Sequence, residues 1–217
     1  MVAPPVKARR GFLIALEGVD GSGKTTQARL LAAALEQRGL EVVLTREPTT
    51  GPLGQQLRQY FQGPERYLTP KEELNLFMAD RRDHVEQVIK PALAAGKLVI
   101  TDRYYYSTVA YQGALGMDPA RILAQNEVLA PRPDMVFILT LPTSEALARL
   151  ASKRGEPTQL SESLDYLERV AVIYDTLRGD HLKRLQALGA PQELQALLLK
   201  ITIKALEDSH FSERGAK

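Results

Sequence analysis

Eight residues near the amino terminus restrict the fold of this chain more than any other feature. Residues 18–25 read GVDGSGKT and match the pattern G-x4-G-K-[ST], with a short apolar segment before them and a helical pattern after them. In such a loop, glycines let successive backbone N–H groups point at phosphate oxygens, beside the positive end of the following helix. The sequence therefore predicts a nucleoside triphosphate site between a strand and a helix.

The residue types in this loop suggest how the phosphates are held. Lys24 supplies a positive charge to the β- and γ-phosphates, and Thr25 offers a hydroxyl to Mg²⁺. The motif alone does not separate kinases from GTPases or ATP-driven motors. The residues expected to bind the nucleotide are Gly18, Val19, Asp20, Gly21, Ser22, Gly23, Lys24, Thr25 and Thr26.

Apolar segments and helical patterns alternate along the rest of the chain. Strands are expected in five segments: 11–17, 41–45, 97–101, 134–141 and 182–188. The segment 41–45 has the composition of a buried strand. The segment 182–188 is a weak strand prediction, and more helix is its alternative. Helices are expected at 25–38, 55–61, 69–95, 119–130, 144–151, 163–185 and 191–206. This alternation predicts an α/β fold, a doubly wound parallel sheet of about five strands with helices on both faces.

Length and charge set the domain organisation and exclude some partners. The 217 residues are expected to form one domain at 11–208, with flexible tails at 1–10 and 209–217. A net charge of +2 gives no field for nucleic acid or a membrane surface, and no apolar run is long enough for a membrane span. Without cysteine or a signal-peptide pattern, we expect a cytoplasmic protein.

The histidines lack a catalytic or metal-binding pattern and are expected on the surface: His84, His181 and His210.

A phosphotransferase also needs cations for the acceptor. Arg46 and Arg103 each follow a predicted strand directly, which places them at the ligand-binding edge, although surface ion pairs are the alternative. Asp102 ends a strand where P-loop enzymes often keep an acid near Mg²⁺, with a helix cap as the alternative. The absence of a clear N-K-x-D sequence disfavours a GTPase switch.

Four segments, in this order, resemble thymidylate kinases: EGVDGSGKTTQ at 17–27, REP at 46–48, LFMADR at 76–81 and DRYYYSTVAYQG at 102–113. The resemblance implies a P-loop nucleoside monophosphate kinase that uses ATP and Mg²⁺ to convert dTMP to dTDP for dTTP biosynthesis. It also implies a homodimer, and an adenine loop at 188–191. A kinase for another nucleoside monophosphate or deoxynucleoside, and a P-loop nucleotide switch, are the alternatives.

The resemblance further implies how the base of dTMP is recognised. Phe77 would stack on thymine, although its apolar neighbours alone would make it a core residue. Arg81 would donate a hydrogen bond to the O4 carbonyl of thymine. Cytosine has an amino group at this position, which could not accept that bond. Ser107 and Gln112 would approach the base.

The sugar and phosphate of dTMP also have implied partners. Arg46 and Arg103 would hold the acceptor phosphate, and Asp20 would face the sugar and its 3′-hydroxyl. Tyr111 would lie where a 2′-hydroxyl projects and so favour deoxyribose.

Catalysis is expected to need a further cation from a lid at about 149–162. Related kinases supply this cation from the P-loop or from the lid, and the P-loop position here is Gly21. Lys153 and Arg154 are therefore the candidates, although Lys153 reads equally as a solvated lysine, and the Asp-Arg pair that usually follows the Arg-Gly step is replaced by other residues. The residues expected to act in catalysis are Asp20, Lys24, Arg103, Lys153 and Arg154.

Overall fold

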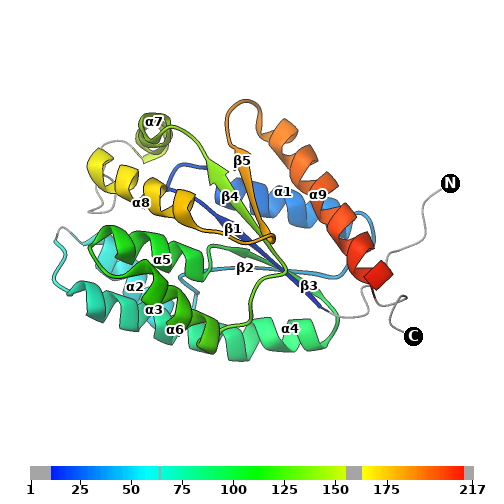
Figure 1. The fold of residues 1–217 in the computed structure, drawn as a ribbon, viewed down its shortest axis with the longest axis horizontal. Coiled ribbons are helices and arrows are strands. Elements are labelled where there is room, and N and C mark those ends of the chain that lie inside the picture. The colour runs from blue at the N-terminus through cyan, green and yellow to red at the C-terminus, as the bar shows by residue number, and fades with distance from the viewer. Residues whose placement is uncertain (1–10, 64, 155–162, 213–217) are drawn as a thin grey trace.

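The structure is a computed structural model that describes residues 11–63, 65–154 and 163–212, without the side chains at 153, 154 and 210–212. Within these residues, five parallel strands form one sheet in the order β2-β3-β1-β4-β5 (Figure 1). The strands are β1 (Phe12–Glu17), β2 (Val42–Arg46), β3 (Leu98–Asp102), β4 (Met135–Thr140) and β5 (Leu182–Gln186). This order confirms the predicted doubly wound sheet, including its weak fifth strand.

Helices cover both faces of the sheet. One face carries α1 (Lys24–Glu36) and α9 (Pro191–Ser212), which pack against each other (Figure 1). The other carries α3 (Pro70–His84), the π-helical turn η1 (Val85–Ile89), α4 (Lys90–Ala94), α5 (Tyr105–Ala114), α6 (Pro119–Leu129) and α8 (Leu164–Thr176). Two further helices extend this layer, α2 (Pro52–Gln62) against α3 and α7 (Thr143–Arg154) against α8.

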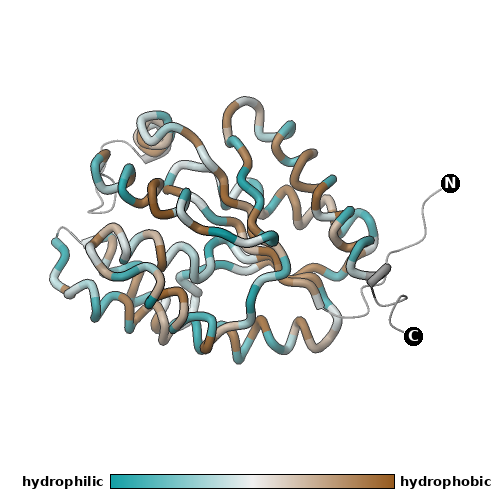
Figure 2. Tube along the Cα trace, viewed as in Figure 1, coloured by the Kyte–Doolittle hydropathy of each residue, from teal (hydrophilic) through white to brown (hydrophobic). Residues whose placement is uncertain are grey.

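The central strand β1 separates two hydrophobic cores because its side chains alternate between the faces. Leu13 and Ala15 join the core beneath α5 and α8, whereas Ile14 and Leu16 join the core beneath α1 and α9. Figure 2 shows the apolar residues concentrated along these central strands. Since a parallel sheet covered on both faces buries its strands completely, β1 reads as a continuous apolar run.

Strand β2 lies at the edge of the sheet and differs from its prediction. Its residues alternate between partly buried and exposed, and the side chain of Leu44 is 43% exposed. The expectation of a buried strand at 41–45 was therefore wrong. An apolar composition does not distinguish a central strand from an edge strand.

Local signals fix where several helices begin. Thr69 and Glu72 form a capping box at the start of α3, in which the Thr69 hydroxyl accepts from the Glu72 backbone N–H and the Glu72 carboxylate accepts from that of Thr69. Asp118 caps α6 by accepting from the backbone N–H of Ala120 at 2.9 Å. Proline stands in the first turn of five of the described helices, at Pro52, Pro70, Pro91, Pro119 and Pro191.

Two helix predictions need correction. The helix expected to reach residue 185 ends at Thr176, before the turn into β5. Helix α5 was not predicted at all, although it carries Ser107, Tyr111 and Gln112. Of the predicted tails, 1–10 and 209–217, residues 1–10 and 213–217 lie outside the described residues, and 209–212 belong to α9, which continues to Ser212. Within the described ranges, no helix combines the length and the apolar composition that a bilayer span requires.

The surface assignment of the histidines was wrong for His84. This side chain is buried, with Nδ1 3.0 Å from Glu47 Oε1 and Nε2 2.7 Å from the hydroxyl of Thr45. His181 is partly buried, and its Nε2 lies 2.7 Å from the Tyr106 hydroxyl. The side chain of His210 lies outside the description.

Candidate active site

The loop at residues 18–23 joins the end of β1 to the first turn of α1. Gly21 and Gly23 adopt left-handed backbone angles, with φ of 83° and 92°, which favour glycine. A Cβ atom on Gly21 would lie 2.3 Å from the backbone oxygen of Ala146 in α7, so this position also has no room for a side chain. The loop thus combines the glycine requirement and the helix start of an anion-binding site.

Lys24 turns back over this loop. Its Nζ donates to the backbone oxygens of Gly18 at 2.9 Å and Val19 at 2.8 Å, and its side chain is buried. Burial lowers the pKa of Lys24 to about 8, and the positive charge of Arg103 acts in the same direction. A buried ammonium held mainly by carbonyl groups is well placed to receive an anion.

Thr25 and Asp102 bring two oxygen ligands together beside the loop. Thr25 Oγ1 donates to Asp102 Oδ2 at 2.5 Å, and both residues border a cavity of about 210 Å³ that also touches Lys24. Among the described residues, no cluster of three or more histidine, cysteine or acidic side chains could hold a metal. The hydroxyl of Thr25 and the carboxylate of Asp102 are oxygen ligands of the kind that suits Mg²⁺, which takes few protein ligands and completes its shell with phosphate oxygens and water.

Asp20, Arg103 and Tyr111 form a polar cluster near the carboxyl end of β3. Arg103 has φ 72°, an angle rare for a residue other than glycine, and its guanidinium pairs with Asp20. The Tyr111 hydroxyl donates to Asp20 Oδ2 at 2.9 Å. Burial acts to raise the pKa of Asp20, but Arg103, Lys24 and Tyr111 outweigh it and lower the pKa to about 2. Asp20 is therefore ionised at neutral pH.

This cluster borders a cavity of about 270 Å³. Its lining combines four cations with four aromatic side chains: Arg46, Arg58, Arg66 and Arg103, and Phe61, Phe77, Tyr111 and Tyr166. The rings of Phe61 and Phe77 lie 5.8 Å apart between centroids. Phe77 thus forms part of a cavity wall and is not a core residue. Such a lining can hold a phosphate and an aromatic base together.

Ser107 and Gln112, both expected near the base, also line this cavity. The Ser107 hydroxyl donates to Glu17 Oε2 at 2.5 Å and lies 3.0 Å from Arg103 Nη1. Gln112 is buried, and its Nε2 donates to Glu73 Oε2 at 2.8 Å. Both side chains are therefore held by buried carboxylates.

Arg81 is anchored by buried polar groups next to the cavity. Its side chain is 1% exposed and is not part of the cavity lining. Its guanidinium donates to Glu47 at 2.6 and 2.9 Å, to Asn126 at 2.5 Å and to the Thr108 hydroxyl at 2.9 Å. Thr108 does line the cavity. The buried carboxylate of Glu47 gives the Arg81 guanidinium a charged partner, and the contact of Arg81 with the base stays a prediction.

Sequence reasoning missed several residues of the site, among them Glu17 and Arg66. Glu17 is fully buried and accepts from the backbone N–H of Tyr104 at 2.9 Å, so it caps the start of α5, and burial raises its pKa. A charged residue at the end of an apolar strand was the available signal. Arg66 lines the cavity and pairs with Glu73 at 3.1 Å, but no motif marks it.

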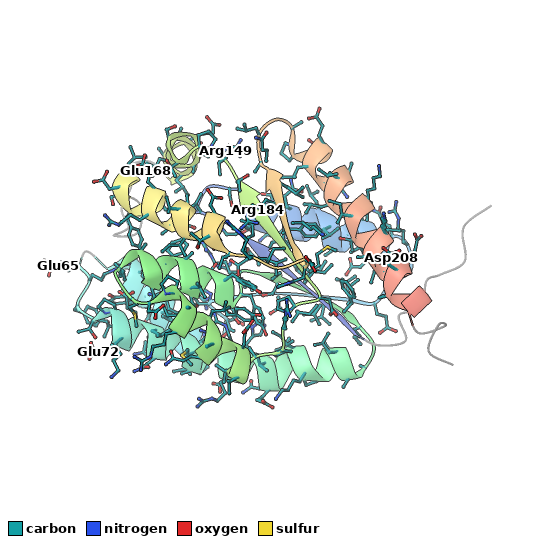
Figure 3. The ribbon with its side chains drawn as sticks, in the orientation of Figure 1. Glu65, Glu72, Arg149, Glu168, Arg184 and Asp208 are labelled. Atoms are coloured by element: carbon teal, nitrogen blue, oxygen red, sulfur yellow. The ribbon has the colours of Figure 1, made fainter. Side chains whose placement is uncertain are left out.

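Helix α7 leads into the predicted lid. The side chains of Lys153 and Arg154, and residues 155–162, lie outside the description, so both catalytic assignments stay predictions. Arg149 is described, on α7 (Figure 3). It borders two cavities beside the P-loop and donates to Glu145 at 3.2 Å. This arginine brings positive charge from α7 to the loop.

The segment between β5 and α9 borders the other side of the P-loop. Leu188, Gly189 and Ala190 line a cavity of about 290 Å³ together with Gly23. The Gln27 side chain ties this segment to α1 by donating to the Pro191 backbone oxygen at 2.9 Å. This position is consistent with an adenine loop at 188–191.

Known proteins resemble most of the chain. The sequence model of one family, thymidylate kinase, matches residues 16–198. A thymidylate kinase from Desulfotalea psychrophila is 44% identical over 185 residues, which cover 85% of this chain and 91% of the relative. Thymidylate kinases from Xanthomonas campestris pv. campestris and Xanthomonas oryzae pv. oryzae are 49% and 47% identical over 174 residues, 79% of this chain and 75% of each relative.

Proposed function

The chain belongs to the thymidylate kinase family, and we propose that it transfers the γ-phosphoryl group of Mg-ATP to dTMP, forming dTDP and ADP. The observation that carries this proposal is the cavity between the P-loop and α3, where Arg46 and Arg103 occur with Phe77 and Tyr166. Cations suit the acceptor phosphate, and aromatic surfaces suit its base. A nucleotide switch would not require this second site.

The acceptor needs orientation more than activation, because a phosphate oxygen is already nucleophilic at neutral pH. One oxygen of dTMP forms a bond to the γ-phosphorus while the bond to the bridging oxygen of ADP breaks. Arg46 and Arg103 would hold the acceptor phosphate, and the ion pair with Asp20 fixes the direction of Arg103. A polar cluster that is already ordered needs little rearrangement during transfer.

The donor phosphates would lie in the loop at 18–23. Lys24, charged in the presence of an anion, would neutralise the β- and γ-phosphates. Thr25 and Asp102 would hold Mg²⁺, which supplies further positive charge to the same oxygens. The lid residues Lys153 and Arg154 would add a cation at the transferred phosphoryl group, as the resemblance implies.

The deoxynucleoside of dTMP would be held by residues of α3 and α5. Phe77 lines the cavity and offers a ring for stacking, while Ser107 and Gln112 offer polar groups. Tyr111, fixed by its bond to Asp20, would exclude a 2′-hydroxyl. Arg81, which the resemblance implies as a donor to O4 of thymine, is held beside the cavity by its bond to Thr108.

The decisive experiment measures ADP formation from Mg-ATP by the purified protein with dTMP, dUMP, dCMP, dGMP, AMP or no acceptor. We expect strong stimulation by dTMP, weaker stimulation by dUMP and background rates otherwise. Equal ADP release without an acceptor would favour the switch, and preference for another monophosphate would favour the alternative kinase. A Lys24→Met variant, purified in parallel, controls for contaminating kinases. The implied homodimer is tested by light scattering on the same sample.

A further inference from the structure

Glu73, on α3, is a buried carboxylate that the proposed transfer chemistry does not use. Its side chain is fully buried, and donors from three parts of the chain converge on it. The Tyr60 hydroxyl donates to Oε1 at 2.5 Å, Arg66 Nε lies 3.1 Å from the same oxygen, and Gln112 Nε2 donates to Oε2 at 2.8 Å. A carboxylate so placed fixes the orientation of its two hydrogen-bond donors, Tyr60 and Gln112.

Gln112 is the donor whose orientation matters for a substrate, because it lines the proposed dTMP cavity. Only the nitrogen of its amide can donate to a carboxylate, so Oε1 has to face away from Glu73. Oε1 is buried and has no hydrogen-bond partner among the described residues. A buried acceptor without a partner is unusual in a folded protein and points to a ligand that supplies the donor.

The other polar side chains of the cavity discriminate less. The hydroxyls of Ser107 and Thr108 can each donate or accept, and Gln62 is exposed. Arg81 does not line the cavity. The Gln112 amide is buried and held at its nitrogen. Among these side chains it therefore has the strongest preference between a base that donates a hydrogen bond and a base that accepts one.

We propose that Glu73 is a positioning residue that makes Gln112 present its oxygen to the base, and thereby selects bases with a ring N–H. Thymine and uracil carry this donor at N3, whereas cytosine carries an acceptor there. Rotation of the amide would suit cytosine, but it would turn Oε1 toward the carboxylate of Glu73. Base selection would then depend on a residue that does not touch the base. This inference rests on the proposed function.

The test compares kcat/KM for dUMP and dCMP, which share sugar and phosphate, in the wild type and in Glu73→Gln. The variant keeps the volume of the side chain but can face either end of the Gln112 amide. We expect the dUMP to dCMP ratio to fall roughly tenfold, the value of about one hydrogen bond, while KM for ATP is unchanged. An unchanged ratio in a folded variant would overturn the inference.

Tyr60→Phe is the matched control. It removes another hydrogen bond to Glu73 and leaves the contact with Gln112, so stability should fall while the ratio is kept. An equal fall of the dUMP to dCMP ratio of kcat/KM in Glu73→Gln and Tyr60→Phe would indicate that Glu73 has only a structural role, and would overturn the inference. A wild type that used neither dTMP nor dUMP would instead contradict the proposed function.

A measurement on the unchanged chain covers the case in which Glu73→Gln does not fold. In an NMR experiment with labelled protein and labelled dTMP, a scalar coupling across the hydrogen bond should connect N3 of the base with Cδ of Gln112. A coupling from Gln112 Nε2 to the base, or none to Gln112, would overturn the inference.

Discussion

The hydroxyl of Tyr111 makes two hydrogen bonds to Asp20, donating to its carboxylate at 2.9 Å and accepting from its backbone N–H at 3.0 Å. Tyr111 belongs to α5 and Asp20 to the P-loop, so this hydroxyl joins the proposed acceptor and donor sites. Its ring also lies near the guanidinium of Arg103, 5.1 Å from Cζ to the ring centroid. Tyr111 therefore holds both the carboxylate of Asp20 and the guanidinium of Arg103 at the place where the two substrates would meet.

Replacing Tyr111 by Phe is expected to lower kcat/KM for dTMP roughly tenfold, because hydrogen bonds worth about 1 kcal/mol each are lost at Asp20. The ring remains, so the preference for dTMP over its ribonucleotide should persist. Steady-state kinetics with both acceptors measure these effects. Tyr106→Phe removes the hydroxyl of another α5 tyrosine, which contacts His181, and serves as the control. An equal loss in this variant would indicate a general weakening of α5.

The efficiency with ATP should decrease as the pH rises above about 8. Burial lowers the pKa of Lys24 to about 8, so the ligand-free loop loses its positive charge in this range. The value of kcat/KM for ATP, which reports on the free enzyme, should fall about tenfold per pH unit beyond that pKa. A flat profile well above pH 8 would contradict the assignment of Lys24.

The stability of the ligand-free protein should increase over the pH range in which kcat/KM for ATP decreases. The unfolded chain keeps the Lys24 proton up to the ordinary pKa of 10.5, while the folded, ligand-free protein releases it above about 8. Since the unfolded state then binds more protons, the Lys24 contribution to the free energy of unfolding rises between these values. Urea denaturation below and above pH 8, with Lys24→Met as the control, isolates this contribution.

Asp102→Asn is expected to raise the Mg²⁺ concentration needed for half-maximal activity roughly tenfold, because a charged oxygen is lost beside Thr25. Titration of activity with Mg²⁺ measures this shift, and chelation should abolish turnover in both proteins. Asp208→Asn makes the same chemical change at an exposed residue of α9 and should leave the titration unchanged. Equal shifts in both variants would remove Asp102 from the metal site.

Gly21→Ala should destabilise the protein more than Gly23→Ala. Both positions have left-handed angles, which cost about 1 kcal/mol for alanine. Only at Gly21 would the new Cβ meet the backbone of Ala146, so a loss of roughly 3 kcal/mol is expected there. Urea denaturation compares the two variants. Equal losses would show that α7 does not press on the loop.

The order of strands and helices could be predicted because the P-loop and the apolar runs are strong local signals. Helix α5 escaped prediction because half of its ten residues, three tyrosines, one valine and one threonine, favour strands in isolation. Its first turn is held by Glu17, which accepts from the backbone N–H groups of Tyr104 and Ser107. A cap supplied from so far along the chain cannot be read from the local sequence.

In the site, too, local sequence signals could be read and contacts set by tertiary packing could not. Arg46, Asp102 and Arg103 could be placed because parallel strands end at one edge of the sheet. Arg81 and His84 could not, because both contact the buried carboxylate of Glu47. The partner of a buried charge is decided by tertiary packing and not by its neighbours in sequence.

The central place of β1 in the sheet also has a consequence for how acceptor choice is encoded. Almost all residues that line the proposed acceptor cavity come from one uninterrupted stretch of chain, 42–130, with Asp20 and Tyr166 contributed from outside. The segments beside the P-loop at α7 and before α9 come after it. Acceptor specificity is thus encoded mainly in one continuous stretch, which also contains the proposed Mg²⁺ ligand Asp102. Exchanging this stretch between kinases that keep an acidic residue at the position of Asp102 should change the acceptor and retain the use of ATP.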